Sequence, residues 1–273
     1  MARHLRPMIL LAPLLAFLAL AYMLPFAGVV TWSVTLPEPG LQNYKAALAD
    51  PLVLSVFWRT LRICTTVTLI SVAMAYFLAL LWVRGTPLVR MLTELCILIP
   101  FWISVLTRAF GWLALLSSRG ILNEWLDSAG VLDAPLRLVR NEFGVAVGMI
   151  HFMIPFAVFP LASAMRTVDE RVLLAARGMG ASRARVFLQV FVPMTAPGIL
   201  GATLLVFVFS IGFFITPAIL GGGRSVMVAE LIYLRIFQSP NWGLAAAISV
   251  ILMLAVSALL TLLLKQIRPG VEK

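Results

Sequence analysis

Charged residues are scarce in this chain. Only 12% of its 273 residues are Asp, Glu, Lys or Arg, while 62% are hydrophobic and the mean hydropathy is +1.04. A soluble domain has an apolar share of about 45–50%. The composition therefore excludes a soluble globular protein and indicates a protein that crosses a membrane several times.

Side chains that perform catalysis or hold metal ions are also few. The chain has two histidines, His4 and His151, and two cysteines, Cys64 and Cys96. It has no HExxH motif, no Ser-His-Asp set and no paired carboxylates within an apolar run, so neither catalytic residues nor a metal site is predicted. Both cysteines are expected to be free apolar residues, and His151 is expected to hydrogen-bond to a neighbouring helix.

A phosphate-binding loop is missing as well. The glycines at 221–223 are not followed by the Gly-Lys-Ser/Thr ending that supplies a lysine and a magnesium ligand. They are interpreted as a flexible exit from an apolar run. No cofactor is predicted in this chain, and energy for any uphill process would have to come from another chain.

Long apolar runs are what the chain does have. Stretches of about 20 apolar residues are long enough to cross a bilayer. The predicted fold class is therefore an all-α membrane protein, a single domain over residues 1–273 with both termini on one side. Basic residues precede the first run, but its length and the lack of an A-x-A site favour a retained span over a signal peptide. The six predicted spans are residues 8–34, 63–83, 91–116, 144–165, 194–220 and 242–264.

The distribution of charge predicts the orientation of these spans. With the N-terminus inside, the inner segments hold twelve basic and three acidic residues, a net of +9, and the outer segments hold eight and seven, a net of +1. Lys and Arg accumulate on the cytoplasmic side of membrane proteins. Both termini, including Arg268, Glu272 and Lys273, and the loop at 167–193 are therefore predicted to be cytoplasmic. The basic residues are spread over separate loops, so nucleic-acid binding is not predicted.

Polar residues inside two spans suggest a passage. Arg108 lies within the third span, where a charge is costly unless it faces a cavity or reaches the membrane surface, and Pro100 interrupts the helix ladder below it. A second interruption is predicted at 210–217. Ordinary packing by small and aromatic residues is the alternative to a passage between two broken spans. The candidate passage residues are Trp102, Thr107, Arg108, Phe213, Phe214 and Thr216.

The loop at 167–193 is predicted to form two short helices. Thr167 and Glu170 match a capping box, Ser182 can cap a second helix and Pro193 is expected to end it. Gly178 and Gly180 can adopt the left-handed conformation that closes the first helix. Charge alone is equally compatible with a basic loop that contacts lipid head groups.

The spacing of this loop resembles the cytoplasmic "EAA" loop of ABC-importer permeases, which docks on an ATPase. Leu174 stands where that family usually has Glu, so the contact made at this position is open. The resemblance identifies the following ATPase-coupling residues: Leu174, Ala175, Ala176, Gly180, Val190, Val192 and Pro193.

Other segments resemble the polyamine (spermidine/putrescine) permease subfamily. These segments are residues 99–123, with Pro100, Phe101, Trp102, Arg108, Phe110, Gly120 and Asn123, and residues 212–232 and 241–249. The resemblance implies a type I importer in the bacterial inner membrane. Its expected partners are a second permease, in a heterodimer, two ATPase subunits that use ATP and Mg, and a periplasmic binding protein.

The cargo itself stays open at this point. Close relatives carry opines, phosphonates and other small amines, and a channel is a further alternative that would have no use for a docking loop. A polycation should favour carboxylates or aromatic faces in its path. The spans contain only one acid, Glu94, near the cytoplasmic edge. Outside them, Glu124, Asp127, Asp133 and Glu142 could guide a cation, grip a binding protein or simply be solvated.

Overall fold

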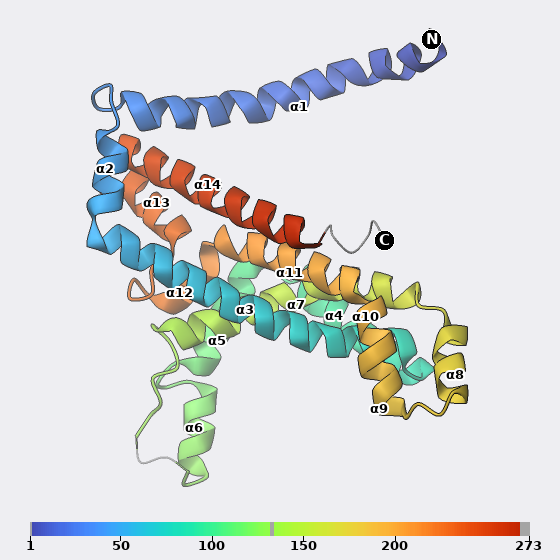
Figure 1. Ribbon diagram of the computed structural model, residues 1–273. Coiled ribbons are helices and arrows are strands. Elements are labelled where there is room, and N and C mark those ends of the chain that lie inside the picture. Colours follow the sequence, from blue (N-terminus) through green and yellow to red (C-terminus); the bar gives the residue numbers. More distant parts are fainter. Residues whose placement is uncertain (1, 132–133, 268–273) are drawn as a thin grey trace. The chain divides into compact units, whose positions relative to one another are not determined.

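The computed structural model describes residues 2–131 and 134–267, and its described ranges contain helices and no strands (Figure 1). Side chains of 2–10, 12 and 263–267 are not described. Asp133, Arg268, Glu272 and Lys273, which entered the charge analysis, lie outside the described residues. The elements are α1 (Ala2–Thr35), α2 (Gln42–Ala49), α3 (Pro51–Arg84), α4 (Pro87–Trp102), α5 (Val105–Leu116), α6 (Ile121–Ser128), α7 (Glu142–Arg166), α8 (Glu170–Gly178), α9 (Arg183–Val186), the π-helical turn η1 (Phe187–Phe191), α10 (Val192–Met194), α11 (Ala196–Ile211), α12 (Ile215–Gly221), α13 (Val228–Phe237) and α14 (Trp242–Ile267).

The predicted all-α fold with six spans is confirmed, although two spans are bent. Within residues 2–131 and 134–267, four helices are long and apolar enough to cross a membrane, and two bent pairs raise the number to six if each pair is one span. The chain bends by 103° between α4 and the helical stretch Val105–Ser128. It bends by 60° between the helical stretch Arg183–Met194 and α11. Neither of the predicted spans 91–116 and 194–220, both of which were expected to be interrupted, is a single straight helix.

The first of these breaks differs from the prediction in its position, and the second agrees with it. Pro100 lies inside α4, and the helix ends two residues later, where Ile103 and Ser104 adopt extended ψ angles of 135° and 141°. A proline can lie inside a helix, where it leaves one backbone carbonyl without its hydrogen bond and kinks the helix instead of ending it. The interruption predicted at 210–217 is present, since α11 ends at Ile211 and α12 begins at Ile215. The span predicted at 63–83 is the C-terminal part of a longer helix, α3, which begins at Pro51.

The chain forms two compact units, residues 1–55 with 231–273 and residues 56–230. In the first unit, Trp32 of α1 meets Trp242 of α14 edge to face, with ring centroids 5.6 Å apart. The Asn43 side-chain amide donates hydrogen bonds to the carbonyls of Ser33 and Leu36. These contacts hold one end of α1, whereas the side chains along its apolar span are not buried within the chain.

The second unit is organised around α7. This helix packs against α4, α5, α11 and α12. Its buried face consists of methionine and aliphatic side chains, among them Met149, Met153, Leu161 and Met165. Small residues let neighbouring helices approach closely in membrane proteins. A Cβ at Gly198 of α11 would lie 2.4 Å from the Cβ of Ala164, so this glycine permits the α7–α11 contact.

A substitution of Gly198 tests this packing. We expect Gly198→Val to lower the stability of the purified protein by about 1–3 kcal/mol, because extra volume in a tight contact forces the helices apart. Gly201 is the matched control, since a Cβ there meets no atom within 4 Å. Thermal unfolding in detergent should show a lower Tm for Gly198→Val and little change for Gly201→Val. Equal Tm values for the two variants would contradict the assigned contact.

Candidate coupling loop and membrane passage

The loop between α7 and α11 begins with α8. Its cap differs from the prediction: the Asp169 carboxylate accepts the hydrogen bond from the Arg171 amide at 2.9 Å. Thr167 instead follows the last turn of α7, and its hydroxyl donates to the Ala164 carbonyl. The predicted Thr167–Glu170 capping box is therefore wrong, because α7 extends to Arg166 and makes Thr167 its C-terminal cap.

The turn that ends α8 is built around Gly180. This residue has φ +87°, while Gly178 is helical and outside the left-handed region. The Gly180 amide donates to the Arg177 carbonyl, and the Ala181 amide donates to the Ala176 carbonyl. These two bonds are the Schellman pattern, which closes a helix with one left-handed residue. The left-handed role predicted for Gly180 is present, and the same role predicted for Gly178 is wrong.

The second half of the loop continues into the membrane helix. Ser182 caps α9 as predicted, accepting from the Arg185 amide at 3.3 Å. Pro193 was predicted to end this second helix, and that prediction is wrong. The proline lies within α10, and the bend follows at Thr195. The π-helical turn η1 precedes this proline, with the Val192 amide bonded to the Phe187 carbonyl. A widened turn lets the chain accommodate a residue that lacks an N–H.

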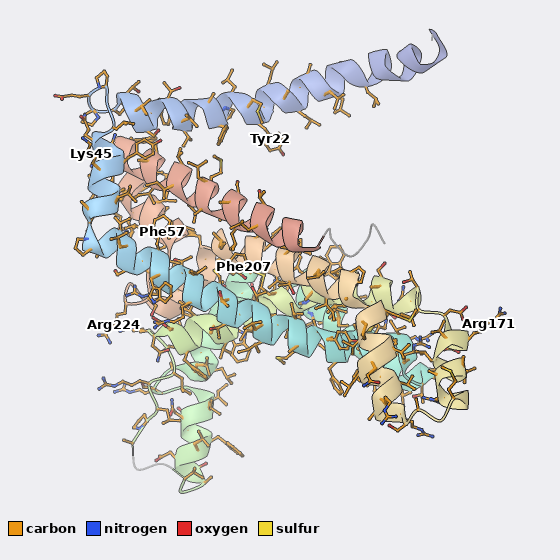
Figure 2. All side chains as sticks on the ribbon, viewed as in Figure 1. Tyr22, Lys45, Phe57, Arg171, Phe207 and Arg224 are labelled. Atoms are coloured by element: carbon orange, nitrogen blue, oxygen red, sulfur yellow. The ribbon has the colours of Figure 1, made fainter. Side chains whose placement is uncertain are left out.

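Large apolar side chains are exposed on this loop. Leu174 and Met179 are 61% and 83% exposed, and Val172 is 42% exposed. Four arginines, at 171, 177, 183 and 185, belong to the same loop, and Arg171, labelled in Figure 2, lies at one end of the unit while Arg224 lies at the other. Large exposed apolar side chains among charged residues are typical of an interaction site. Of the remaining predicted coupling residues, Ala175 and Pro193 are exposed, Val190 and Val192 are half-buried, and Ala176 is buried.

Arg84 connects this loop to the end of α3. Its guanidinium forms an ion pair with Glu170 in the first turn of α8, and it donates a hydrogen bond of 3.4 Å to the Val168 carbonyl. The same group lies 5.6 Å from the centre of the Phe191 ring in η1. Sequence reasoning treated Arg84 only as a cytoplasmic charge. Its partners are at least 84 residues away in the sequence, so no local pattern could reveal them.

Arg108 is the central residue of the predicted passage. Its guanidinium carbon lies 4.4 Å from the centre of the Phe152 ring of α7, and the Phe152 and Phe213 rings are 4.6 Å apart. The Nε and Nη1 atoms of Arg108 are buried without a hydrogen-bond partner. Arg108 and Phe213 are therefore brought together through Phe152, a residue that the sequence analysis did not select.

The other predicted passage residues are distributed differently. Thr216 is buried, and it approaches α7 at Gly148, where a Cβ would lie 2.6 Å from its methyl group. Phe214 is half-buried in the break between α11 and α12. Trp102 is 82% exposed and Thr107 is also exposed, so neither joins the group around Arg108 within this chain. The role of each of these residues in a passage stays a prediction.

The opposite end of the unit holds a group of ionic contacts. Glu142 accepts a hydrogen bond from Arg62 at 2.5 Å and lies 3.5 Å from Arg59. These contacts pair the Glu142 carboxylate with two cations.

Glu230 is nearly fully buried, and this burial raises the pKa of its carboxyl, an effect that a hydrogen bond with the Met227 backbone partly offsets. Among the described residues, no group of three His, Cys, Asp or Glu side chains is placed to hold a metal. The predicted hydrogen bond of His151 is present, with the Trp112 indole as donor at 3.0 Å.

Apolar helices, two bent spans and a short helical loop between α7 and α11 are features expected of a membrane transport subunit. The chain belongs to the family described as "Binding-protein-dependent transport system inner membrane component", whose sequence profile matches residues 7–273. This membership confirms the expectation of a multi-pass inner-membrane transport subunit rather than an enzyme.

Individual relatives agree with the family. The chain is 34% identical over 210 residues to the spermidine/putrescine transport system permease protein PotB of Haemophilus influenzae, covering 77% of this chain and 73% of the relative. It is 32% identical over 220 residues to PotB of Escherichia coli, covering 81% and 80%. A crystal structure of a bacterial ABC transporter for the acidic polysaccharide alginate contains a chain of the same fold, with a TM-score of 0.83, 15% identity and coverage of 100% and 98%.

Proposed function

We propose that this chain is the permease subunit of an importer for small linear polyamines of the spermidine and putrescine type. The observation that carries the proposal is the 32–34% identity to PotB permeases over most of the chain. The marks of the resemblance at Pro100, Trp102 and Arg108 fall in the region where α4 and α5 meet α7. Opines, phosphonates and amino-acid-like amines are the alternative cargoes.

Energy for transport would come from a separate ATPase. The exposed side chains of Leu174 in α8 and of Met179 at its C-terminal cap, in a loop with four arginines, fit the surface of a protein partner. We propose that loop 167–193 docks on this ATPase, which binds ATP and Mg. Since the loop then lies in the cytoplasm, both termini lie there too, in agreement with the charge difference of +9 against +1.

The remaining partners follow from the same proposal. They are a second permease, with which the chain forms a heterodimer, a second ATPase subunit, and an extracytoplasmic binding protein that delivers the cargo. One of the structural neighbours is an alginate transporter in complex with a periplasmic protein, which supports this last partner. Purification of the tagged chain from membranes should recover a second permease and an ATPase.

Transport assays test the cargo. In vesicles that contain the complete complex, ATP and the binding protein, labelled spermidine should accumulate, and unlabelled putrescine should compete with it. Opines and phosphonates should not compete at the same concentration. Accumulation of one of these solutes without accumulation of spermidine would leave the permease class intact and contradict the polyamine assignment.

The isolated chain should have neither ATPase activity nor ion conductance. It has no Gly-Lys-Ser/Thr phosphate loop, and its passage opens only with its partners. We expect ATP hydrolysis at the level of empty vesicles and no single-channel currents in planar bilayers. Adding the partner subunits should restore ATP-dependent uptake in the same preparation. Discrete currents from the purified chain alone would favour a channel.

A further inference from the structure

One face of α7 carries three aromatic rings. Phe152, Phe156 and Phe159 follow the i, i+4, i+7 spacing that places side chains on one side of a helix. All three are partly exposed, whereas Met149, Met153 and the other large core side chains of α7 are fully buried.

These rings form a continuous series with rings of α4 and α3, and Phe156 also lies 5.3 Å from Phe209 of α11. Phe152 and Phe156 are stacked with centroids 5.3 Å apart, and Phe156 lies 5.5 Å from Phe101 of α4. Phe101 lies 5.9 Å from Phe159, which lies 6.2 Å from Trp82 of α3. We call Phe152, Phe156, Phe101, Phe159 and Trp82 the aromatic track. All belong to the unit of residues 56–230.

Cations of the chain itself already occupy both ends of the aromatic track. Arg108 lies over Phe152 at 4.4 Å, and Arg166 lies over Trp82 at 4.9 Å. Along α7 the rings run from Phe152 to Phe159, roughly 10 Å at 1.5 Å per residue, and the Trp82 ring lies 6.2 Å from that of Phe159. The aromatic track therefore follows roughly a third to a half of a hydrocarbon core of roughly 30 Å.

The single acid of the spans lies at the Arg166 end. The Trp82 indole donates to the Glu94 carboxylate at 3.4 Å. Trp82, Arg90, Glu94 and Arg166, together with Val83, line a pocket of about 420 Å³. Between this pocket and Arg108, the rings are the groups on this face that can stabilise a cation without carrying charge.

We propose that the aromatic track is the path of the cationic cargo through this subunit, with successive ammonium groups moving from ring face to ring face until they reach Glu94. This proposal rests on the polyamine function proposed above. Several weak, equivalent sites suit transport, because a passage must bind the cargo well enough to admit it and weakly enough to release it. Arg108 and Arg166 cover the terminal ring faces when no cargo is present, and an arriving ammonium group replaces each of them.

Fluorinated phenylalanine at position 156 tests the path without changing its shape. Each fluorine withdraws electron density from the ring face and weakens cation binding, while the ring keeps nearly its size. We expect spermidine uptake by the complete complex to fall with each added fluorine, by about fivefold or more for the fully fluorinated ring. Phe207, buried in α11 and labelled in Figure 2, is the matched control, and the same series there should leave uptake unchanged.

Conventional variants complete the test. Phe156→Leu should lower uptake about tenfold and Phe156→Tyr should retain it, since tyrosine keeps the aromatic face. Glu94→Gln should lower uptake severalfold and Glu94→Asp should preserve most of it. A Tm equal to that of the unsubstituted complex would establish that Phe156→Leu acts on transport and not on folding. If the Phe156→Leu variant does not fold, the fluorinated series decides the question.

The outcomes separate the two proposals. If the unsubstituted complex imports spermidine but fluorination at 156 has no effect, the aromatic track is not the path and the polyamine function stands. If the complex imports an uncharged or anionic solute instead, both proposals fail. A graded loss at 156 with no loss at 207 supports both.

Discussion

Replacing Gly180 by valine should uncouple transport from ATP hydrolysis, with uptake lowered about tenfold or more. Gly180 has φ +87° at the end of α8, and its amide and that of Ala181 make the two bonds that close the helix. A left-handed conformation costs a side-chain-bearing residue about 1–2 kcal/mol, and a β-branched residue is the least tolerant of it. Valine would shift the turn to another conformation and displace the exposed patch beside it.

The control for this variant is Gly178→Val. A Cβ at either glycine meets no atom within 4 Å, and only Gly180 has a left-handed φ. We expect both variants to reach the membrane in normal amounts, and only Gly180→Val to lose uptake and co-purification of the ATPase. Normal uptake by Gly180→Val with the ATPase bound would show that the turn is not the coupling element.

The second large effect is expected at Arg108. Its guanidinium carbon lies 4.4 Å from the centre of the Phe152 ring, and its buried Nε and Nη1 atoms have no hydrogen-bond partner. If the aromatic track is the path of the cargo, a cation at this point competes with the cargo for the ring and speeds its release. We expect Arg108→Ala to lower uptake about tenfold, because a cargo ammonium group would then leave the Phe152 ring more slowly, by a factor within the range of a desolvated cation–π contact.

Lysine at this position separates two explanations. Arg108→Lys keeps the charge and the contact with the ring but loses the planar fork of five donors. Retained uptake would support electrostatic competition, and lost uptake would support a structural anchor. The affinity of the binding protein for free cargo should be unchanged in both variants, and Arg119→Ala, an exposed arginine outside the group, should behave as the unsubstituted protein. Wild-type uptake by Arg108→Ala and Arg108→Lys would remove α5 from the passage.

Local features of the coupling loop were predictable to different degrees. The left-handed Gly180 and the Ser182 cap depend on a few neighbouring residues, and both are present. The roles of Thr167 and Pro193 were predicted wrongly for a common reason. Whether a threonine begins a helix or ends one, and whether a proline breaks one, depends on how far the adjacent helices extend, and packing against the rest of the unit decides that extent.

The sequence by itself determined that the chain is helical, membrane-embedded and divided into apolar spans, because bilayer thickness and the burial of backbone polar groups leave no other fold for such a composition. It also located Arg108 and the second helix break. The tertiary structure alone decided which residues meet across helices. The aromatic track joins α3, α4 and α7, and Arg84 reaches Glu170 across 86 residues of sequence. Phenylalanine in an apolar span has the same hydrophobicity whether it faces the core or a passage. Only the rotation of α7 against its neighbours distinguishes these two environments.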